Sequence, residues 1–469
     1  MSDVLVIGYG SATHQLLRRL RHHGHSGTVT VLSAEHRPLP NRPLLTTVLA
    51  GRLDPRVLRP APAPGARVLT GAVATAIDPA ARVVHARHGD TVTAHPYDVL
   101  VLATGARPVI PAISTTMGRD GTLPPGVTTL RRAADCDRIR GERAVVLGGG
   151  PLGVETASAL AARGTATTLV CAGPHPLHDR LGDTCAGLLT ERLRAAGVTV
   201  LGGRTVVRRE PGRVVLDDGT EAAADSLVLC TGVEPEVGLA RAAGIRVHHG
   251  IVVDDALRTS DSRVHAIGDC AEHAGRAVAG HESALAQADT LAAVLTGRAT
   301  AHPPAPAILR LRTHAVDVAC VGPLAAFGRH GIRTVGLFDP AGGRYARLAL
   351  DGDRIAAAVL LGLPEAIATI GHLYRRGLPV PSDRPGLLLG IRPQPGPAAA
   401  ADPADAVVCL CNHVSRRQLA DAWELGARTA PELARATRAT TGCGSCVTRV
   451  ERLCADLADA AERKLEPTP

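Results

Sequence analysis

The chain has very few aromatic residues and almost no lysine. Its 469 residues include 2 Phe, 4 Tyr and 1 Trp, and the one lysine is Lys464. Nucleic-acid-binding proteins commonly stack bases on aromatic rings, so this scarcity argues against that class of protein. The net charge of +8 and the isoelectric point of about 9.1 do not reverse this conclusion, because the arginines are scattered along a chain rich in Ala, Arg, Gly and Pro.

Long hydrophobic runs and an export signal are absent as well. No stretch of about 18 or more apolar residues occurs, so the sequence predicts no membrane-spanning helix. The first residues lead straight into an apolar segment without the basic region and cleavage site of a signal peptide, so we expect a cytoplasmic protein. The 11 cysteines then favour reduced thiols or metal ligands over a disulfide framework.

Two segments of the chain repeat one strand–turn–helix–strand pattern. The first begins with VLVIG at residues 4–8 and the second with AVVLG at residues 144–148, and both are apolar runs typical of buried parallel strands. A glycine-rich turn, a helical pattern and a second apolar run follow in each case. Both segments also close on an apolar run that enters a Thr-Gly turn, at Thr104-Gly105 and at Thr231-Gly232. Two such segments predict two nucleotide-binding units.

The glycine spacing of the two turns suits a pyrophosphate. The first turn has Gly8 and Gly10, with Thr13 at the third position, whereas the second has Gly148, Gly150 and Gly153. Glycine permits a tight turn and lets backbone N–H groups approach a phosphate at a helix N-terminus. The first turn alone is a weak signal, but the complete second turn makes the pair a strong one.

Acidic residues stand where they can contact the rest of a dinucleotide. Glu35 ends the second strand of the first unit, where a carboxylate can accept from ribose hydroxyls, and a solvated strand end is the alternative. Asp269 follows Gly268 after another apolar run, and a helix N-cap is its alternative role. The matching strand of the second unit ends at Cys171-Ala172, with neither an acid for a 2′-hydroxyl nor an arginine for a 2′-phosphate. The choice between NADH and NADPH therefore stays open.

These segments together resemble the flavoprotein reductases with two dinucleotide-binding folds, over residues 1 to about 300. The resemblance implies that the first turn holds the FAD pyrophosphate, that the second holds NAD(P)H and that Asp269 bonds the flavin ribityl chain. NRPLLTTVLAG at residues 41–51 is similar to a segment of the ferredoxin-reductase-like branch in which the arginine, here Arg42, contacts FAD. The cofactor-binding candidates are thus Gly8, Gly10, Glu35, Arg42, Thr104, Gly105, Gly148, Gly150, Gly153, Gly232, Gly268 and Asp269.

The last segment carries four cysteines in two close pairs. Cys409 and Cys411 form C-x-C, and Cys443 and Cys446 form C-x-x-C. Four thiolates suit either a [2Fe-2S] cluster or a tetrahedral zinc ion, and the spacing alone does not choose between them. The flavin and nicotinamide turns upstream favour the cluster, because such a chain needs a one-electron exit and zinc has no redox chemistry.

Two further resemblances complete the predicted architecture. Residues 313–362 resemble the domain that follows the flavoprotein part of the NADH-dependent assimilatory nitrite reductase large subunit and its nitrate-reductase electron-transfer relatives, and the cysteine segment resembles the bacterioferritin-associated-ferredoxin-like (BFD-like) [2Fe-2S] domain. The fold class is therefore α/β, with two dinucleotide-binding (Rossmann-like) domains, a small α+β domain and a small, mostly helical [2Fe-2S] domain. The expected boundaries are 1–107 with 245–300 (FAD), 108–244 (NAD(P)), 301–390 (α+β), 391–406 (linker) and 407–460 ([2Fe-2S]).

Three residues differ from the family pattern, and a fourth residue matches it but loses its family partner. Thr47 stands where the family has a lysine near the flavin, and Glu155 matches the glutamate that pairs with this lysine. These two are the candidate catalytic positions. We expect Glu155 to be left buried and unpaired, with a raised pKa or another donor, which would affect the rate of flavin reduction. Pro40 replaces an aromatic residue, and Thr13 replaces a glycine, so we expect the first helix to pack less closely on its turn.

The other cysteines and the clustered histidines are expected to be structural. Cys171, Cys230 and Cys320 lie in apolar runs typical of a core, and core packing is also preferred for Cys270, which follows the Gly-Asp pair. The histidines within residues 22–25 are expected at a solvated helix end rather than at a metal.

The sequence thus predicts an NAD(P)H-dependent FAD/iron–sulfur oxidoreductase that serves as an electron-transfer subunit. Electrons would leave through the [2Fe-2S] cluster to another polypeptide, because no sirohaem or molybdenum site is recognised in this chain. By resemblance the acceptor is the assimilatory nitrate reductase catalytic subunit, with a nitrite reductase second. The alternatives are an FAD-binding redox sensor or scaffold with a structural metal and a nucleic-acid-binding zinc module. A homodimer is left open, and neither a nucleic-acid nor a membrane partner is expected.

Overall fold

The computed structural model describes most of the chain, in two compact units. The described residues are 2–36, 42–55, 65–113, 122–277, 280–299, 301–302, 308–391, 406–409, 414–437, 439–440 and 446–465. Residues 1–172 and 204–305 belong to the first unit, and residues 173–203 and 306–469 belong to the second. Within the described residues, no helix is long and apolar enough to cross a membrane.

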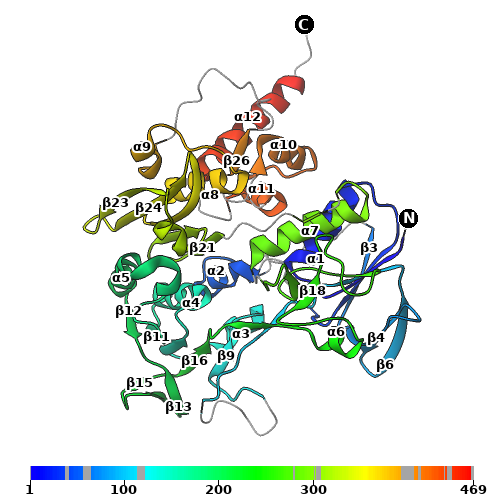
Figure 1. The fold of residues 1–469 in the computed structure, drawn as a ribbon, viewed down its shortest axis with the longest axis horizontal. Helices are drawn as coiled ribbons and strands as arrows, with labels where there is room; N and C mark the ends of the chain where they lie inside the picture. Colours follow the sequence, from blue (N-terminus) through cyan, green and yellow to red (C-terminus); the bar gives the residue numbers. More distant parts are fainter. Residues whose placement is uncertain are drawn as a thin grey trace. The chain divides into compact units, whose positions relative to one another are not determined.

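The first sheet of the first unit is parallel and buried. Its strands are β1 (Val4–Ile7), β2 (Val29–Ser33), β3 (Ala66–Thr70), β7 (Val99–Leu102) and β19 (Val264–Ala266), in the order β19-β7-β1-β2-β3. All four residues of β1 are buried, which explains its uninterrupted apolar run. The helices α1 (Ser11–His22) and α7 (His281–Leu295) pack against each other (Figure 1). The α1 residues Leu16 and Leu20, both 0% exposed, join the core with this sheet.

A second parallel sheet in the same unit repeats this design. The strands β11 (Ala166–Cys171), β10 (Arg143–Leu147), β16 (Ser226–Leu229) and β9 (Val127–Thr129) follow one another in that order, and α4 (Pro151–Ala162) packs on β10 and β11. The predicted α/β class with two dinucleotide-binding folds is confirmed.

Smaller elements complete the first unit. Two antiparallel sheets contain β4 (Val73–Asp78), β5 (Val83–His88) and β6 (Thr91–Pro96), and β13 (Val206–Glu210), β14 (Arg213–Leu216) and β15 (Glu221–Ala223). The strands β8 (Ala106–Pro108) and β17 (Val233–Pro235) form an antiparallel ribbon, and β18 (Ile251–Val253) pairs with β20 (Ala271–His273) in parallel. The short helices are η1 (Arg42–Leu44), α2 (Leu45–Leu49), α3 (Ala133–Arg138) and α6 (Gly238–Ala242). The ribbon brings the two predicted Thr-Gly turns together.

The second unit contains an antiparallel sheet with helices. The strands β21 (Ile308–Arg312), β22 (Asp317–Val321), β25 (Arg354–Leu361), β24 (Arg344–Asp351) and β23 (Arg333–Asp339) are ordered β21-β22-β25-β24-β23. The other elements here are α5 (His178–Ala195), β12 (Val198–Gly202), η3 (Leu324–Gly328), α8 (Pro364–Arg376) and α9 (Arg384–Leu388). Ile367 and Ile370 of α8 are buried against the sheet. The five strands of this sheet, with η3, α8 and α9, lie within residues 301–390, where the sequence predicts a small α+β domain.

The C-terminal module of the second unit is mostly helical. It consists of β26 (Val407–Cys409), β27 (Val414–Ser415), α10 (Arg416–Glu424), α11 (Ala430–Thr437) and α12 (Val447–Leu465). Ser415 caps α10 and accepts from the Gln418 N–H at 3.3 Å. The core gathers residues from all three helices, among them Trp423 of α10. The guanidinium of Arg428 lies 5.0 Å from the centre of the Trp423 ring.

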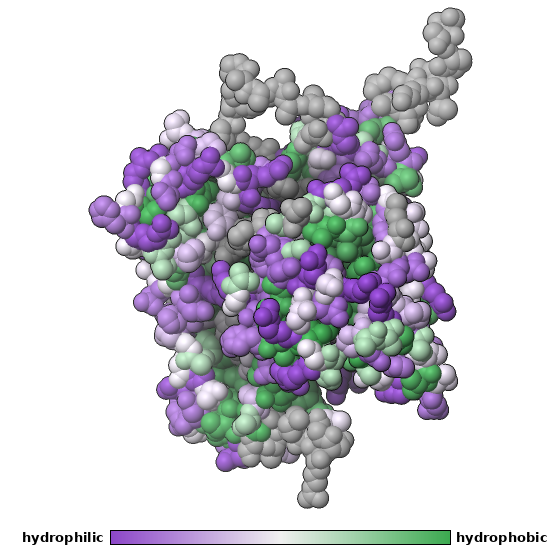
Figure 2. Space-filling model, turned by 45° about the vertical axis from the view of Figure 1, so that its right-hand side comes forward, coloured by the Kyte–Doolittle hydropathy of each residue, from purple (hydrophilic) through white to green (hydrophobic). Residues whose placement is uncertain are grey.

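The surface is mixed in polarity. Figure 2 shows hydrophilic side chains over much of the face it draws, with hydrophobic areas between them. Exposed apolar residues include Phe338 and Leu425, which are 61% and 89% exposed, both in the second unit.

Candidate functional site

The first glycine turn forms an open cradle at the N-terminus of α1. Gly8 has a φ of +101°, and a Cβ there would lie 2.2 Å from the carbonyl oxygen of Ala103, so only glycine fits. Gly10 is the N-cap residue of α1, and no side chain caps this helix end. A Cβ on Gly10 would have no heavy atom within 4 Å, which leaves room for a ligand beside the helix N-terminus.

The second glycine turn has the same geometry at the N-terminus of α4. Gly148 has a φ of +121°, and a Cβ there would lie 2.2 Å from the carbonyl oxygen of Cys230. Gly150 is again the N-cap residue with open space around it. The third glycine matters for packing, since a Cβ on Gly153 would lie 1.8 Å from the carbonyl oxygen of Gly148.

Thr13 occupies the matching third position of the first turn. Its side chain is fully buried, and its hydroxyl donates to the carbonyl oxygen of Gly8 at 2.8 Å. The first helix thus leaves room for a side chain that the second helix excludes at Gly153. This is the looser packing that the sequence predicts.

Charged side chains converge near the first turn. Glu35 pairs with Arg42, whose Nη2 lies 2.8 Å from Glu35 Oε1, and Arg132 Nε lies 4.0 Å from the same oxygen. Arg131 Nη2 lies 3.8 Å from Asp269 Oδ2. Burial and the neighbouring Arg42 lower the pKa of Arg131, while Asp269 and Glu35 act in the opposite direction. The cluster supplies both guanidinium groups for a phosphate and carboxylates for hydroxyl groups.

Sequence reasoning missed Arg131 and Arg132. They follow β9 in the segment TLRRAAD, and this strand pairs in parallel with β16. Two adjacent arginines after the short segment VTTL were the available signal.

Several buried polar atoms in the first unit have no hydrogen-bond partner among the described residues. They include Nε of Arg42, Nε of Arg131, Oγ1 of Thr46 and Oγ of Ser283. An unsatisfied buried donor is costly, so such atoms suit a polar ligand. Together with the open cradle at Gly10, they fit a dinucleotide with a pyrophosphate, as FAD has.

The two Thr-Gly turns hold each other through backbone and hydroxyl bonds. The Thr104 hydroxyl donates to the Glu236 carbonyl at 2.7 Å, and the Glu236 N–H donates to Gly105 O at 2.9 Å. The Val109 N–H likewise donates to Gly232 O at 3.0 Å. The Thr104 side chain therefore fixes the ribbon of β8 and β17.

Asp269 is held beside the start of α7. Its Oδ1 accepts from the Gly280 N–H at 2.9 Å, and Gly280, not Asp269, is the N-cap residue of α7. The preceding Gly268 has a φ of +82° and donates its N–H to Gln287 Oε1 at 2.6 Å. Gln287 is buried, so this carboxylate stands on a fixed turn.

The candidate catalytic pair comes from two packed helices. Thr47 lies on α2, which packs against α4, and α4 carries Glu155. Glu155 is partly exposed on α4 rather than buried, and it is not without a partner, which agrees with the expected alternative that it finds another donor. The missing lysine at position 47 therefore leaves no isolated buried charge. Pro40 lies outside the described residues.

The cysteines in the apolar strands are core residues, as predicted. Cys171, Cys230, Cys270 and Cys320 are all buried. Burial raises the pKa of Cys230 to about 12 and that of Cys320 to about 11, so these thiols stay protonated near neutral pH. The Cys270 thiol donates to the Ile267 carbonyl at 3.3 Å.

The histidines at the end of α1 are only partly solvated. His22 is exposed, but His25 is 6% exposed, which corrects the prediction of a solvated cluster. Burial lowers the pKa of His25, and the nearby positive charge of Arg21 lowers it further by a smaller amount. The His25 backbone N–H donates to Leu20 O at 2.9 Å, which keeps this residue against the end of α1.

Two of the four predicted metal ligands lie in the described part of the C-terminal module. Cys409 is 0% exposed and Cys446 is 1% exposed, and both belong to the module core. The Thr440 N–H donates to Cys446 Sγ at 3.3 Å, an arrangement that suits a thiolate. Cys411 and Cys443 lie outside the described residues. The described residues alone contain no group of three or more metal-ligating side chains, which is expected when only half of the set can be placed.

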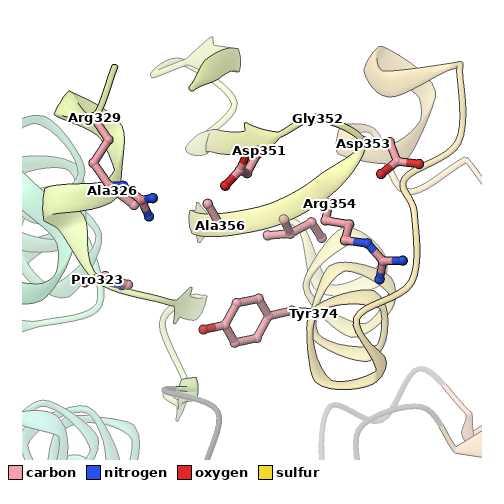
Figure 3. Close-up of a pocket in the computed structure, with 10 residues that line it drawn as sticks. Pro323, Ala326, Arg329, Asp351, Gly352, Asp353, Arg354, Ala356 and Tyr374 are labelled. Atoms are coloured by element: carbon pink, nitrogen blue, oxygen red, sulfur yellow. The ribbon is translucent and has the colours of Figure 1, made fainter. Parts of the chain in front are cut away.

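A separate cavity lies in the small α+β domain (Figure 3). Its volume is about 570 Å³, and its wall includes Arg329, Asp351, Arg354 and Tyr374. None of the predicted site residues lines it, and the charged groups around it have both signs. We assign it no role in the chemistry.

Two parallel sheets, each with a glycine turn at a helix N-terminus, define a flavoprotein reductase of the two-dinucleotide class. The chain belongs to the pyridine nucleotide-disulphide oxidoreductase family, whose model matches residues 2–288. Residues 407–456 match the BFD-like [2Fe-2S] binding domain. The first match implies FAD and NAD(P)H as cofactors, and the second implies a [2Fe-2S] cluster.

Curated relatives and solved structures agree with this assignment. The nitrite reductase (NAD(P)H) large subunit of Klebsiella oxytoca is 32% identical over 80% of this chain and 40% of its own length. The assimilatory nitrate reductase electron transfer subunit of Bacillus subtilis is 28% identical over 95% of this chain and 58% of its own length. The chain thus spans about half the length of these relatives. The structure of a covalent putidaredoxin reductase–putidaredoxin complex matches 82% of this chain and 95% of that chain, with 27% identity and a TM-score of 0.71.

Proposed function

We propose that this protein is a cytoplasmic electron-transfer subunit that carries electrons from NAD(P)H, by way of FAD and the [2Fe-2S] cluster, to a separate catalytic subunit. The favoured acceptor is the catalytic subunit of an assimilatory nitrate reductase, and a nitrite reductase is the second choice. The observation that carries the proposal is the presence, in one chain, of two complete dinucleotide folds and a four-cysteine module. A relative named as an assimilatory nitrate reductase electron transfer subunit matches 95% of the chain, which supports the choice of acceptor.

The residues of the first sheet would hold FAD. The backbone at Gly8 and Gly10 would face the pyrophosphate, and Arg42 would supply a positive charge beside it. Glu35 would accept from ribose hydroxyls, and Asp269 would bind the ribityl chain from its fixed turn. When bound, FAD can accept two electrons together and release them one at a time.

The residues of the second turn would hold NAD(P)H. Gly148 and Gly150 leave the N-terminus of α4 open to the pyrophosphate, and Gly153 lets the helix approach the turn. Glu155 lies one turn along α4, on the helix that packs on α2. In this proposal Glu155 and Thr47 border the place where nicotinamide meets flavin.

The four cysteines of the C-terminal module would ligate the cluster. Cys409 and Cys446 are held by the helical core, and the Thr440 N–H bonds the Cys446 sulfur. Cys411 and Cys443 complete the set of four thiolates in the sequence.

The test is an anaerobic preparation studied by visible absorption and low-temperature EPR before and after addition of NADH or NADPH. We expect the flavin absorption to bleach and a [2Fe-2S] signal to appear. Cys446→Ser should remove the signal and keep the flavin bleaching. Cys454→Ser is the matched control, because Cys454 is a partly buried thiol on α12 outside the proposed ligand set, and it should retain both.

Two results would overturn the proposal. Flavin that does not bleach over minutes with either dinucleotide would exclude a reductase. Bound flavin with zinc in place of iron would favour the alternative, a redox sensor or scaffold with a structural metal site. If neither result is found, a further assay decides the acceptor. It compares the rate at which the protein reduces a purified nitrate reductase catalytic subunit with the rate for a nitrite reductase.

A further inference from the structure

The strand that follows the second glycine turn ends without an acidic residue. The Gly148 N–H donates to Val170 O at 2.8 Å, so the turn lies beside the end of β11. The next residue, Cys171, is 2% exposed and ends the strand. In dinucleotide-binding folds this position faces the adenosine ribose, where a carboxylate accepts from the 2′-hydroxyl of NAD and an arginine accommodates the 2′-phosphate of NADP. At this strand end the chain offers no such carboxylate.

An arginine from a distant part of the sequence lies against this strand end. The backbone N–H of Arg204 donates to the carbonyl oxygen of Cys171 at 3.0 Å. This bond fixes the Arg204 Cα beside the last residue of β11, although 33 positions separate the two residues in the numbering. The sequence alone gave no sign of this proximity.

The Arg204 side chain is oriented by a carboxylate. Its Nε lies 2.6 Å from Asp218 Oδ2, and Asp218 lies in the turn between β14 and β15. Hydrogen bonds from Thr220 contribute most to keeping the pKa of Asp218 below its usual value, and the Arg204 guanidinium lowers it further. The side chain of Arg204 is 43% exposed, so solvent and a ligand can reach it.

We propose that Arg204 binds the 2′-phosphate of NADPH and that the reductase prefers NADPH to NADH. A guanidinium forms charge-assisted hydrogen bonds with a phosphate, whereas the 2′-hydroxyl of NADH would find no acidic acceptor at Cys171-Ala172. Asp218 positions the guanidinium and keeps its hydrogen bonds from Thr220. This inference rests on the proposed entry of electrons from a nicotinamide dinucleotide at the second turn.

The first experiment compares kcat/KM for NADPH and NADH in the full-length holoenzyme, with ferricyanide as the artificial acceptor. We expect the wild type to favour NADPH by at least about tenfold. Arg204→Ala should lower kcat/KM for NADPH by about tenfold, mainly through KM, and so move the ratio toward NADH. The substitution leaves the backbone bond to Cys171 in place, so the fold of the strand end is preserved.

A matched variant controls for loss of an exposed ion pair. Arg208 lies on β13 and pairs with Glu210 at 2.8 Å, and its side chain is 51% exposed. Arg208→Ala removes the same charge and a similar pair, but it should leave the NADPH to NADH ratio unchanged. In the opposite direction, Ala172→Glu adds a carboxylate at the strand end and should shift the ratio toward NADH.

A binding measurement gives a readout that does not depend on turnover. Calorimetric titration with adenosine 2′,5′-bisphosphate and with 5′-AMP should show tighter binding of the bisphosphate, and Arg204→Ala should remove most of that difference. A wild type that favours NADH, or a ratio and a binding difference that Arg204→Ala does not change, would overturn the inference. Flavin that neither dinucleotide bleaches would instead contradict the proposed function.

Discussion

The third residue of each glycine turn controls how closely a helix approaches its turn. A Cβ on Gly153 would lie 1.8 Å from a backbone oxygen, whereas Thr13 fits into the first turn and bonds Gly8. The neighbour at Gly153 is backbone, so it cannot move aside as a flexible side chain would. The second turn is therefore the more sensitive of the two to substitution.

Gly153→Ala should displace α4 from its turn and raise KM for NAD(P)H by about tenfold or more, because the N–H groups at the helix N-terminus would move away from the pyrophosphate. The flavin spectrum should persist. Steady-state kinetics and visible absorption check both outcomes. Gly371→Ala is the control, since Gly371 lies within α8 and a Cβ there meets nothing within 4 Å. An unchanged KM in Gly153→Ala would contradict the assignment of this turn.

Glu272 shows how one buried carboxylate can contribute to stability. It is 3% exposed, and it accepts from the Gly250 N–H at 2.8 Å and lies 3.1 Å from His248 Nδ1. Burial favours the neutral acid, but these partners outweigh it and lower the pKa below the ordinary value of 4.5. The stabilisation is complete above that ordinary pKa and is lost as the pH falls through the lower folded-state pKa.

Glu272→Gln should therefore lower the stability of the protein by about 2 kcal/mol near neutral pH. The difference from wild type should shrink as the pH falls below about 4.5. Thermal unfolding of both proteins at a series of pH values measures this. The comparison is Glu234→Gln, which removes a carboxylate that is 56% exposed and paired with Arg107, and which should change stability little at any pH. A constant difference across the series would show that ionisation of Glu272 is not involved.

At the scale of elements, α2 packs on α4 and so links the segment after the first sheet to the second glycine turn. Thr47 on α2 is partly exposed, and Thr46 beside it is buried with an unpartnered hydroxyl. This contact is where we propose that nicotinamide and flavin meet.

Thr47→Lys should place an ammonium group between these helices and accelerate flavin reduction by NAD(P)H by about tenfold, because a nearby positive charge stabilises negative charge that develops on the reacting groups. Stopped-flow absorption measures the rate. Thr47→Met, with similar length and no charge, should leave the rate close to wild type. Equal rates in the lysine and methionine variants would mean that charge at this position does not matter.

Most of the fold could be predicted from the sequence because its signals are local. The two strand–turn–helix segments combine apolar runs with glycine spacing, and β1 and β10 occur where those runs lie. The antiparallel sheets β4–β6 and β13–β15 were not predicted. Their strands are partly exposed, as in β4, so their hydrophobic pattern is weak.

The candidate site was predictable in its glycines, its acids and Arg42, but not in its other arginines. Arg131 and Arg204 reach their places through strand pairing and long-range backbone bonds, such as that between Arg204 and Cys171. Such proximity depends on topology, which a linear pattern does not contain. The exposure of Glu155 was missed for the same reason, because it depends on what packs against α4.

At the scale of the whole molecule, the reductase part and the cysteine module have separate cores. A chain that ends after Ile391 should keep flavin bleaching by NAD(P)H and ferricyanide reduction within about twofold of the full chain, while losing the [2Fe-2S] signal and electron transfer to the partner subunit. Visible absorption measures flavin bleaching, EPR measures the [2Fe-2S] signal, and a coupled nitrate reduction assay measures electron transfer to the partner. Continued transfer to the partner would show that electrons leave directly from the flavin.

The scarcity of aromatic residues has a practical consequence in this setting. Trp423 is the one tryptophan of the chain, and it lies in the small core that also contains Cys409 and Cys446. Its fluorescence therefore comes from a single module among 469 residues. An assembled cluster should quench this emission by energy transfer, and loss of the cluster should restore it. The protein thus carries a built-in optical indicator of cluster assembly, which can be followed in the full-length chain without any label.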